Sequence, residues 1–508
     1  MKKQKNKMFS ALLVLTTVSI FTAACSTKDA TPAQTMQPDN TSAKTPLKLS
    51  MMLPGYSTQL PEKNNSILTK LTEATNVEVT PVWVPSTSYE DKFNITLASG
   101  QMPEVMVALT KSSTFINAAR NGAFWEVGPY LKDYPNLSQV NPIVLDNISV
   151  DGKIYGIYRS RALGRNGIAY RKDWLEKVGL QPPKTIDDFY NMLKAFKTKD
   201  PDGNNATGLL LTKNNGALDI MQTWFGVPNQ WGQDASGKLV PAHMTPEYMN
   251  ALQFFKKLYS EQLINQDFPI TDPAKAEEFM GNGVAGVSVG VTDTAQRIEE
   301  KIWTVRPELK NVSVMEPLGA IEGPAGIRVL PTDGYAGMLL ISKTSVKTEG
   351  DLRKVLTFLD RLNDKDMQIL LYNGIENRHF TMDKSGGVIG SPDANITAEF
   401  ASLNQMLMFI PEDRNLLPVQ TPTRKKVAEV QKANIKQVIG NPAASFISSV
   451  YAQKGPQLDS IINDIRIKFI VGKTDENGFK QAIELWRKSG GDDYIKEMND
   501  LYAAKAKK

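Results

Sequence analysis

The stretch LKLSMML, from Leu47 to Leu53, alternates apolar and polar residues at its start and ends at Pro54-Gly55. This alternation predicts a β-strand, and the Pro-Gly pair predicts the loop into which the strand runs. Further strands are predicted at 77–84 (VEVTPVWV) and 104–109 (EVMVAL), with a helix over 89–98 between them. Because Pro81 cannot donate to a ladder, the strand at 77–84 is predicted to lie at a sheet edge.

Two later helices have explicit start signals. Thr185 and Asp188 have the spacing of a capping box, and Thr245-Pro246 places a capping residue before a proline at the first helical position. Apolar stripes follow each signal and are expected to be core: Ile186, Phe189, Met192, Leu193 and Phe196, then Tyr248, Leu252, Phe255 and Tyr259. Strands that alternate with helices predict α/β lobes with mostly parallel sheets, in which ligands collect at the carboxyl ends of the strands.

Residues 1–24 have the architecture of a signal peptide. Four lysines, at positions 2, 3, 5 and 7, precede the uncharged stretch Met8–Ala24, which ends in small residues. The alternative is a retained membrane anchor, but about 17 residues is the lower limit for a spanning helix. Cleavage would remove four of the 59 basic and none of the 54 acidic residues. The remaining chain would carry 55 basic and 54 acidic residues, so its net charge is near zero. No basic stripe with interleaved aromatic residues argues for nucleic acid.

Cys25 is the only cysteine of the 508 residues, so it can form no internal disulfide and is either a free thiol or chemically modified. Thr22-Ala-Ala-Cys25 resembles the lipobox of bacterial lipoproteins, in which the cysteine receives a diacylglycerol and becomes the first mature residue. Two acyl chains anchor a protein firmly. Residues 25–46, rich in Thr, Ser, Ala, Pro and Asp, are then expected to form a flexible linker between the lipid and the fold.

Few residues suit catalysis. The only histidines are His243, which is expected to be solvent-facing or structural, and His379. No H-E-x-x-H or C-x-x-C occurs, so zinc is unsupported. Gly281-Asn-Gly-Val-Ala-Gly286 spells a dinucleotide fingerprint, but a predicted helix precedes it and a predicted strand follows, the reverse of what a pyrophosphate needs. A glycosidase that uses a pair of carboxylates remains an alternative.

The loop Asp200-Pro-Asp202-Gly-Asn204 places oxygen ligands at alternate positions, as a calcium loop does. The twelfth position should supply a bidentate carboxylate, and here it is Leu211. We expect at most weak calcium binding, and the alternative is a turn that ends the helix begun at Thr185.

Four stretches carry a family likeness: 97–109 (LASGQMPEVMVAL), 124–137 (FWEVGPYLKDYPNL), 167–204 (GIAYRKDWLEKVGL to KDPDGN) and 490–504 (GGDDYIKEMNDLYAA). In this order they resemble the extracellular solute-binding proteins of ABC importers, in particular the large LplA-like or LipO-like lipoproteins of Gram-positive bacteria, which are linked to oligosaccharide uptake. Relatives often carry acidic residues after DPDGN, where this sequence has Asn205-Ala-Thr-Gly208. The resemblance implies no enzymatic activity.

The resemblance implies a two-lobe periplasmic-binding-protein-like fold of type II, with the ligand in a cleft between two α/β lobes that close over it. The first lobe is expected at 47–157 plus 316–372 and the second at 158–315 plus 373–508. It also implies a monomer that delivers a carbohydrate to an ABC permease and is anchored by lipid to the outer face of the cell membrane.

Candidate ligand-binding residues follow from sugar chemistry, because sugars offer CH faces to aromatic rings and hydroxyls to planar donors. Trp224 and Trp231 flank a Gly/Pro turn and are candidate stacking platforms, with core packing as the alternative. There are eight further candidates: Arg159, Arg161, Arg165 and Asn166 stand beside the expected lobe crossing, Tyr56 and Lys111 follow predicted strands, and Tyr335 and Arg378 lie in the stretches TDGYAG and GIENRHF. A solute-binding lipoprotein, a lipid-anchored glycosidase and an envelope scaffold are the three hypotheses; only the first predicts ligand-dependent closure without turnover.

Overall fold

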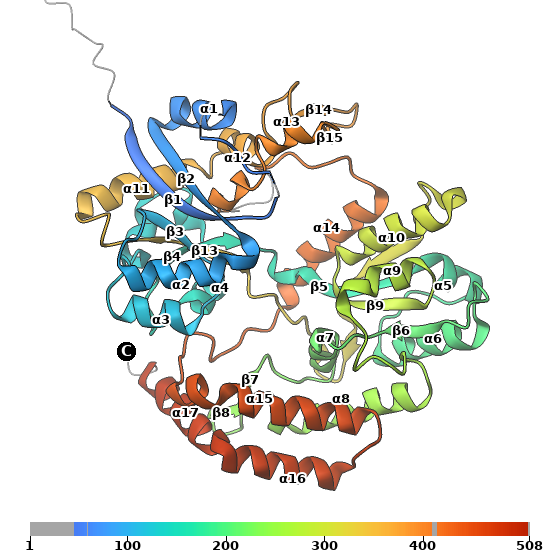
Figure 1. The fold of residues 1–508 in the computed structure, drawn as a ribbon. Coiled ribbons are helices and arrows are strands. Elements are labelled where there is room, and N and C mark those ends of the chain that lie inside the picture. Colours follow the sequence, from blue (N-terminus) through green and yellow to red (C-terminus); the bar gives the residue numbers. More distant parts are fainter. Residues whose placement is uncertain (1–44, 58, 64, 409–413, 506–508) are drawn as a thin grey trace, which may run out of the picture. The chain divides into compact units, whose positions relative to one another are not determined.

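The first sheet contains five strands in the order β2-β1-β3-β13-β4 (Figure 1). In the computed structural model, residues 45–57, 59–63, 65–408 and 414–505 are described. The strands are β1 Leu47–Gly55, β2 Val77–Pro85, β3 Val105–Ala108, β4 Gly156–Ser160 and β13 Tyr335–Ile341. The three strands predicted from the sequence all form, and β2, which contains Pro81, lies at the edge as predicted.

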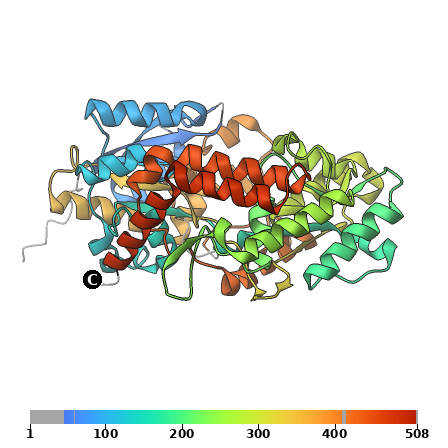
Figure 2. The same cartoon turned by 90° about the horizontal axis from the view of Figure 1, so that it is seen from below.

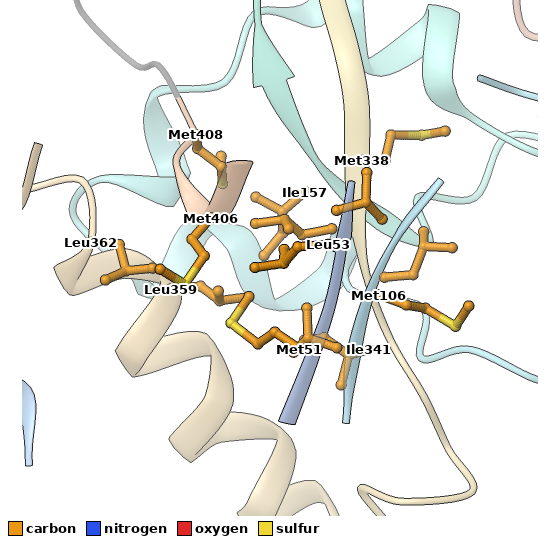
Figure 3. Close-up of a cluster of buried hydrophobic side chains, with 14 of the residues drawn as sticks. Met51, Leu53, Met106, Ile157, Met338, Ile341, Leu359, Leu362, Met406 and Met408 are labelled. Atoms are coloured by element: carbon orange, nitrogen blue, oxygen red, sulfur yellow. The ribbon is translucent and has the colours of Figure 1, made fainter. Parts of the chain in front are cut away.

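Helices cover this sheet and complete the first core. They are α1 Ser66–Thr75, α2 Tyr89–Ser99, α3 Ser113–Arg120, α4 Pro142–Ile148, α11 Glu349–Arg361 and α12 Lys365–Tyr372. Methionine and aliphatic side chains from the strands and from α11 meet in one buried cluster (Figure 3). Met406 and Met408 join this cluster from far along the chain.

The second sheet contains four strands in the order β10-β5-β9-β6. They are β5 Asn166–Arg171, β6 Thr207–Leu210, β9 Ala285–Val291 and β10 Met315–Leu318. The surrounding helices are α5 Lys172–Val178, α6 Ile186–Lys199, α7 Gly216–Trp224, α8 Pro246–Ser260, α9 Ala276–Gly281, α10 Thr294–Val305 and α14 Pro422–Asn434. The capping box at Thr185 and Asp188 forms, and both predicted apolar stripes pack against the second core. The glycines from Gly281 to Gly286 connect α9 to β9, so the helix does precede the strand.

The sheets are mixed, which corrects the expectation of mostly parallel sheets. β1 pairs in parallel with β2 and β3, and β6 with β9, but β13 and β5 are antiparallel to both of their neighbours. Both exceptions are strands that the chain enters from the other sheet, because β5 follows β4 of the first sheet and β13 follows β10 of the second. A strand that arrives by such a crossing is not constrained by the βαβ connection that makes neighbours parallel.

The two connections that cross between the sheets run beside each other. Arg161 N–H donates to the carbonyl of Gly334 (2.9 Å), and Thr332 N–H donates to that of Leu163 (3.1 Å). The second connection contains the short hairpin of β11 Glu322–Gly323 and β12 Gly326–Ile327. The lobe boundaries themselves remain a prediction; the packing places Leu403, Met406, Leu407 and Met408 with the first core, although the expected second lobe included them.

The last part of the described chain is helical. α15 Ser449–Ile470 packs against α8 and α16 Glu476–Trp486, and α17 Asp492–Lys505 packs against a hairpin of β7 Trp231–Gln233 and β8 Leu239–Pro241 (Figures 1 and 2). The remaining elements are β14 Phe380–Met382, β15 Val388–Gly390 and α13 Ala394–Ala398. Within the described ranges no helix has both the length and the apolar character that crossing a membrane requires. The predicted signal peptide and Cys25 lie outside those ranges.

Candidate functional site

A cavity of about 320 Å³ lies where β3 ends and β13 begins, and we call it the lysine cavity. Its lining comes from the segments after β3 and before β13, from α4, from a turn before β7 and from the segment around Asn441. Its polar lining comprises Lys111, Asn147, Thr332, Asp333, Tyr335, Asn229, Gln230 and Asn441.

Lys111 is held in the wall of this cavity by two carbonyl groups. Its Nζ donates to the carbonyls of Ser149 (3.1 Å) and Ala444 (2.9 Å). Burial lowers the pKa of Lys111 to about 8, with the charges of Asp333 and Asp146 acting in the opposite direction. Burial likewise raises the pKa of Tyr335 to about 12, so its hydroxyl stays protonated at neutral pH.

A second cavity, of about 430 Å³, is lined by rings, and we call it the aromatic cavity. The rings of its lining are Trp231, His243, Tyr248, Tyr451, Trp486 and Tyr494. Tyr494 meets Trp231 edge-on (centroids 5.1 Å apart) and stacks on Tyr451 (5.0 Å).

The polar groups of the aromatic cavity include two carboxylates, each of which accepts a hydrogen bond from another side chain of the lining. Arg466 donates to Asp219 (2.7 Å), and the Tyr451 hydroxyl donates to Asp459 (2.6 Å). Burial lowers the pKa of His243 to about 4, so its ring is neutral at neutral pH. His243 was expected to be solvent-facing or structural; its ring packs edge-on against Trp486 (4.6 Å) and forms part of this cavity wall.

A third cavity, of about 370 Å³, is lined by Arg328 together with Pro228, Gln233 and Pro442, and we call it the arginine cavity. The three cavities share walls. Gln230 lines the lysine and aromatic cavities, Asn229 and Asn441 line the lysine and arginine cavities, and Trp231 lines the arginine and aromatic cavities. We treat them as one tract, the candidate ligand site.

The structure brings three of the predicted site residues together in this tract: Lys111, Tyr335 and Trp231. Trp224 lies elsewhere. It ends α7, is fully buried in the second core and meets Phe189 edge-on (5.2 Å). This is the packing role that the sequence left open for it.

The arginines beside the lobe crossing make contacts within the protein. Arg159 is 2% exposed and donates to the carbonyl of Ala336 and the side chain of Gln405, and burial lowers its pKa to about 10. Arg161 donates to the carbonyl of Ser160. Arg165 pairs with Asp293 (2.6 Å), and Asn166 donates to the carbonyl of Leu330. A solute contact for these four remains a prediction.

Two other predicted residues lie outside the lining of the tract. Tyr56 is 60% exposed, and its N–H donates to the hydroxyl of Ser402. Arg378 forms a two-bond ion pair with Glu399. Contact of either residue with solute likewise stays a prediction.

The Asp200–Asn204 loop does not fit calcium. The Asp200 carboxylate already accepts N–H groups of Asn204, Asn205 and Ala206. The Asp202 side chain is 2% exposed and lies within ion-pair distance of three cations, Arg171 (3.1 Å), Lys177 (3.0 Å) and Arg306 (2.9 Å). A divalent cation here would be repelled by three positive charges. Elsewhere in the described chain no group of three or more His, Cys, Asp or Glu side chains is placed to hold a metal.

The ion pairs also set the protonation of Asp202. Burial acts to raise the pKa of this carboxyl, but Arg306, Arg171 and Lys177 together hold it far below its ordinary value. The carboxylate is therefore ionised at every physiological pH, with protein cations in the place that a metal would take.

Several lining residues were missed by the sequence reasoning. Arg328, Tyr451, Trp486 and Asn441 come from segments far apart in the chain. Tyr494 lies within GGDDYIKEMNDLYAA, a stretch that contributed only to the family likeness. No local pattern marks such residues, because Tyr451, Trp486 and Tyr494 meet through the packing of α15, α16 and α17. The segments of Arg328 and Asn441 meet through the pairing of Val329 with Val438.

Comparison with known sequences gives consistent matches. The family described as "Bacterial extracellular solute-binding protein" matches residues 59–368. "Lipoprotein LipO" of Bacillus subtilis (strain 168) is 44% identical over 466 residues, which cover 89% of this chain and 92% of that protein. "Polygalacturonan/rhamnogalacturonan-binding protein YtcQ" of the same organism is 34% identical over 464 residues, which cover 90% of this chain and 91% of that protein.

Solved structures share the fold. An extracellular solute-binding protein from Bifidobacterium longum subsp. infantis superposes with a TM-score of 0.67 at 17% identity, covering 91% of this chain and 99% of that one. The substrate-binding protein FusA of S. pneumoniae, solved with kestose, superposes with a TM-score of 0.62 at 20% identity, covering 91% of this chain and 100% of that one. These likenesses confirm the two-lobe α/β fold.

Proposed function

Because this chain belongs to the bacterial extracellular solute-binding proteins, we propose that it captures an oligosaccharide in the tract of three cavities and delivers it to an ABC permease. The chain is a solute-binding protein and not an enzyme, so the glycosidase alternative is set aside. The observation that carries the proposal is the tract itself, three cavities that share lining residues and are walled by rings and polar groups from distant parts of the chain.

The chemistry of the lining supports a sugar. The rings that line the tract, Trp231 among them, are apolar surfaces for CH groups, and amides and carboxylates such as Gln230, Asn441 and Asp333 can exchange hydrogen bonds with hydroxyls. The names of two relatives support the same class, since YtcQ is named for polygalacturonan and rhamnogalacturonan and FusA of Streptococcus pneumoniae for fructooligosaccharides.

Delivery requires that the lobes close and that the protein stay near the membrane. We propose that the paired crossing segments around Arg161 and Gly334 serve as a hinge, because both connect the two sheets and they lie side by side. We further propose that Cys25 carries the lipid anchor on the outer face of the cell membrane and that the protein works as a monomer. The lipoprotein name of the relative LipO supports the anchor.

The test is a calorimetric and thermal-shift screen of the full chain against plant and microbial oligosaccharides. A ligand at about 100 times its dissociation constant adds about 2.7 kcal/mol of stability. For a ligand found this way, Trp231→Ala should lose about 2 kcal/mol of binding or more. The core variant Trp224→Ala should instead lose about 3 to 5 kcal/mol of folding stability.

Trp303→Ala serves as the matched control, because Trp303 lies on α10 outside the lining of the tract. It should bind like the parent. Absence of binding to every oligosaccharide, or full affinity in Trp231→Ala, would contradict the proposed site.

A further inference from the structure

Arg328 lies on an extended segment beside the tract. Val329 pairs with Val438: its N–H donates to the carbonyl of Gln437 (2.9 Å), and its own carbonyl accepts the N–H of Ile439 (3.0 Å). Side chains two positions apart in an extended chain point to the same side. Arg328 and Leu330, which line the arginine and lysine cavities respectively, therefore face the same side of this segment.

The guanidinium of Arg328 differs from the other cations of the tract. Of the described residues that line the three cavities, three are cationic: Lys111, Arg328 and Arg466. Arg466 is paired with Asp219, and Lys111 donates to two carbonyls. The Arg328 side chain has no hydrogen bond or ion pair with another described residue, and its buried Nε lacks any acceptor. A buried donor without an acceptor is unfavourable, so the Arg328 guanidinium is suited to donate hydrogen bonds to an acceptor group of a ligand.

The rest of the arginine cavity contains no group that would neutralise this charge. No acidic residue is among its described lining, and its amide side chains already donate within the protein. Asn229 donates to the carbonyl of Ile439, Asn441 to Gln230 and Gln233 to the hydroxyl of Tyr502. The cavity therefore offers one unpaired planar cation beside the indole of Trp231.

A planar guanidinium matches a carboxylate, which can accept two parallel hydrogen bonds from it. A neutral sugar would leave the charge without a counterion as the lobes close and exclude water. We propose that Arg328 binds the carboxylate of a uronic acid unit whose ring lies against Trp231, so that the solute is an acidic oligosaccharide. This inference rests on the proposed function and narrows its ligand class.

The experiment compares matched ligands that differ only in the carboxylate. Trigalacturonate and trimannuronate, each beside its carboxyl-reduced neutral counterpart, are titrated into the full chain by calorimetry. At least one acidic form should bind about 10-fold to 100-fold more tightly than its neutral counterpart, as expected for charge-assisted hydrogen bonds. The preference should decrease as salt is raised.

Three variants assign the preference to Arg328. Arg328→Gln should abolish the preference by weakening the acidic form to the affinity of its neutral counterpart, and Arg328→Lys should retain part of it, because a lysine keeps the charge but not the planar fork. Arg424→Gln, which removes an ion pair between Arg424 of α14 and Glu300 of α10 outside the lining of the tract, should behave as the parent. Unchanged melting temperatures confirm that the variants are folded.

The outcomes separate this inference from the proposed function. If neutral oligosaccharides bind as tightly as acidic ones, or Arg328→Gln keeps the preference, the carboxylate subsite is wrong and the oligosaccharide function stands. If no carbohydrate of either kind binds, the proposed function fails and the subsite fails with it.

Discussion

At the scale of single residues, location in the fold decides which aromatic and cationic side chains can meet a ligand. Trp224 and Trp231 are close in sequence and both are buried (0% and 5% exposed), yet Trp224 ends a helix inside the second core, whereas Trp231 begins a strand in the wall of two cavities of the tract. Arg159 and Arg328 differ in their hydrogen bonds. The guanidinium of Arg159 donates to two protein groups, whereas the buried Nε of Arg328 has no acceptor among the described residues.

Lys111 provides a prediction about pH. Because its pKa in the folded state is about 8 and the ordinary lysine value is 10.5, the unfolded chain binds more protons than the folded one between these values. Stability contributed by this group therefore rises with pH from about 8 to 10.5. Lys111→Met removes the titration, so the difference in unfolding free energy between parent and variant should grow in favour of the parent over this range.

The measurement is urea unfolding of parent and variant at pH 7.5, 8.5 and 9.5. Taking the difference cancels the other lysines and tyrosines, which titrate alike in both proteins. A difference that stays constant over the three pH values would contradict a lowered pKa for Lys111.

At the scale of elements, the loop that ends α6 takes its rigidity from protein charges. Asp202 joins α5, through Lys177, and the segment after α10, through Arg306, to the end of α6. We expect Asp202→Asn to cost about 3 to 5 kcal/mol of folding stability, because it leaves the 1% exposed Arg171 and its neighbours with fewer counter-charges. Urea unfolding measures this loss.

Calcium should neither stabilise the parent nor rescue Asp202→Asn, and a chelator should not shift the melting temperature. Asp187→Asn, which alters an exposed carboxylate of the same helix, is the matched control and should change stability by less than about 1 kcal/mol. A rise in melting temperature with millimolar calcium would show that the loop binds metal after all.

The sequence predicted which strands and helices form better than it predicted how they pair and pack against one another. Alternation identified β1, and Pro81 identified β2 as an edge strand, because both depend on local chemistry. The expectation of mostly parallel sheets failed at β5 and β13, because the direction of these strands depends on where the chain crosses between the sheets. Of the tract residues, Lys111 was proposed because it follows a predicted strand and Tyr335 because it lies in the stretch TDGYAG, whereas Arg328 and Tyr451 are brought there by packing between distant segments.

At the scale of the whole molecule, one cysteine is expected to determine where the protein resides. Cys25→Ala should release the protein from the membrane fraction or leave it unprocessed, because the chain has no other thiol to acylate. Fractionation followed by immunoblotting measures this, with Ser26→Ala as the neighbouring control. Unchanged membrane association of Cys25→Ala would contradict the lipid anchor.

The place of β13 in the first sheet has a consequence for export. β4 pairs with β13 alone, and β13 also pairs with β3, so the strand at 335–341 completes a sheet whose other members precede residue 161. A chain that leaves the cell from its N-terminus exposes the apolar faces of β3 and β4 until residue 341 has emerged. During that interval the half-built sheet is open to aggregation and proteolysis, since pairing so distant in sequence forms slowly. Extracytoplasmic chaperones would therefore protect the nascent first lobe most effectively before β13 is available.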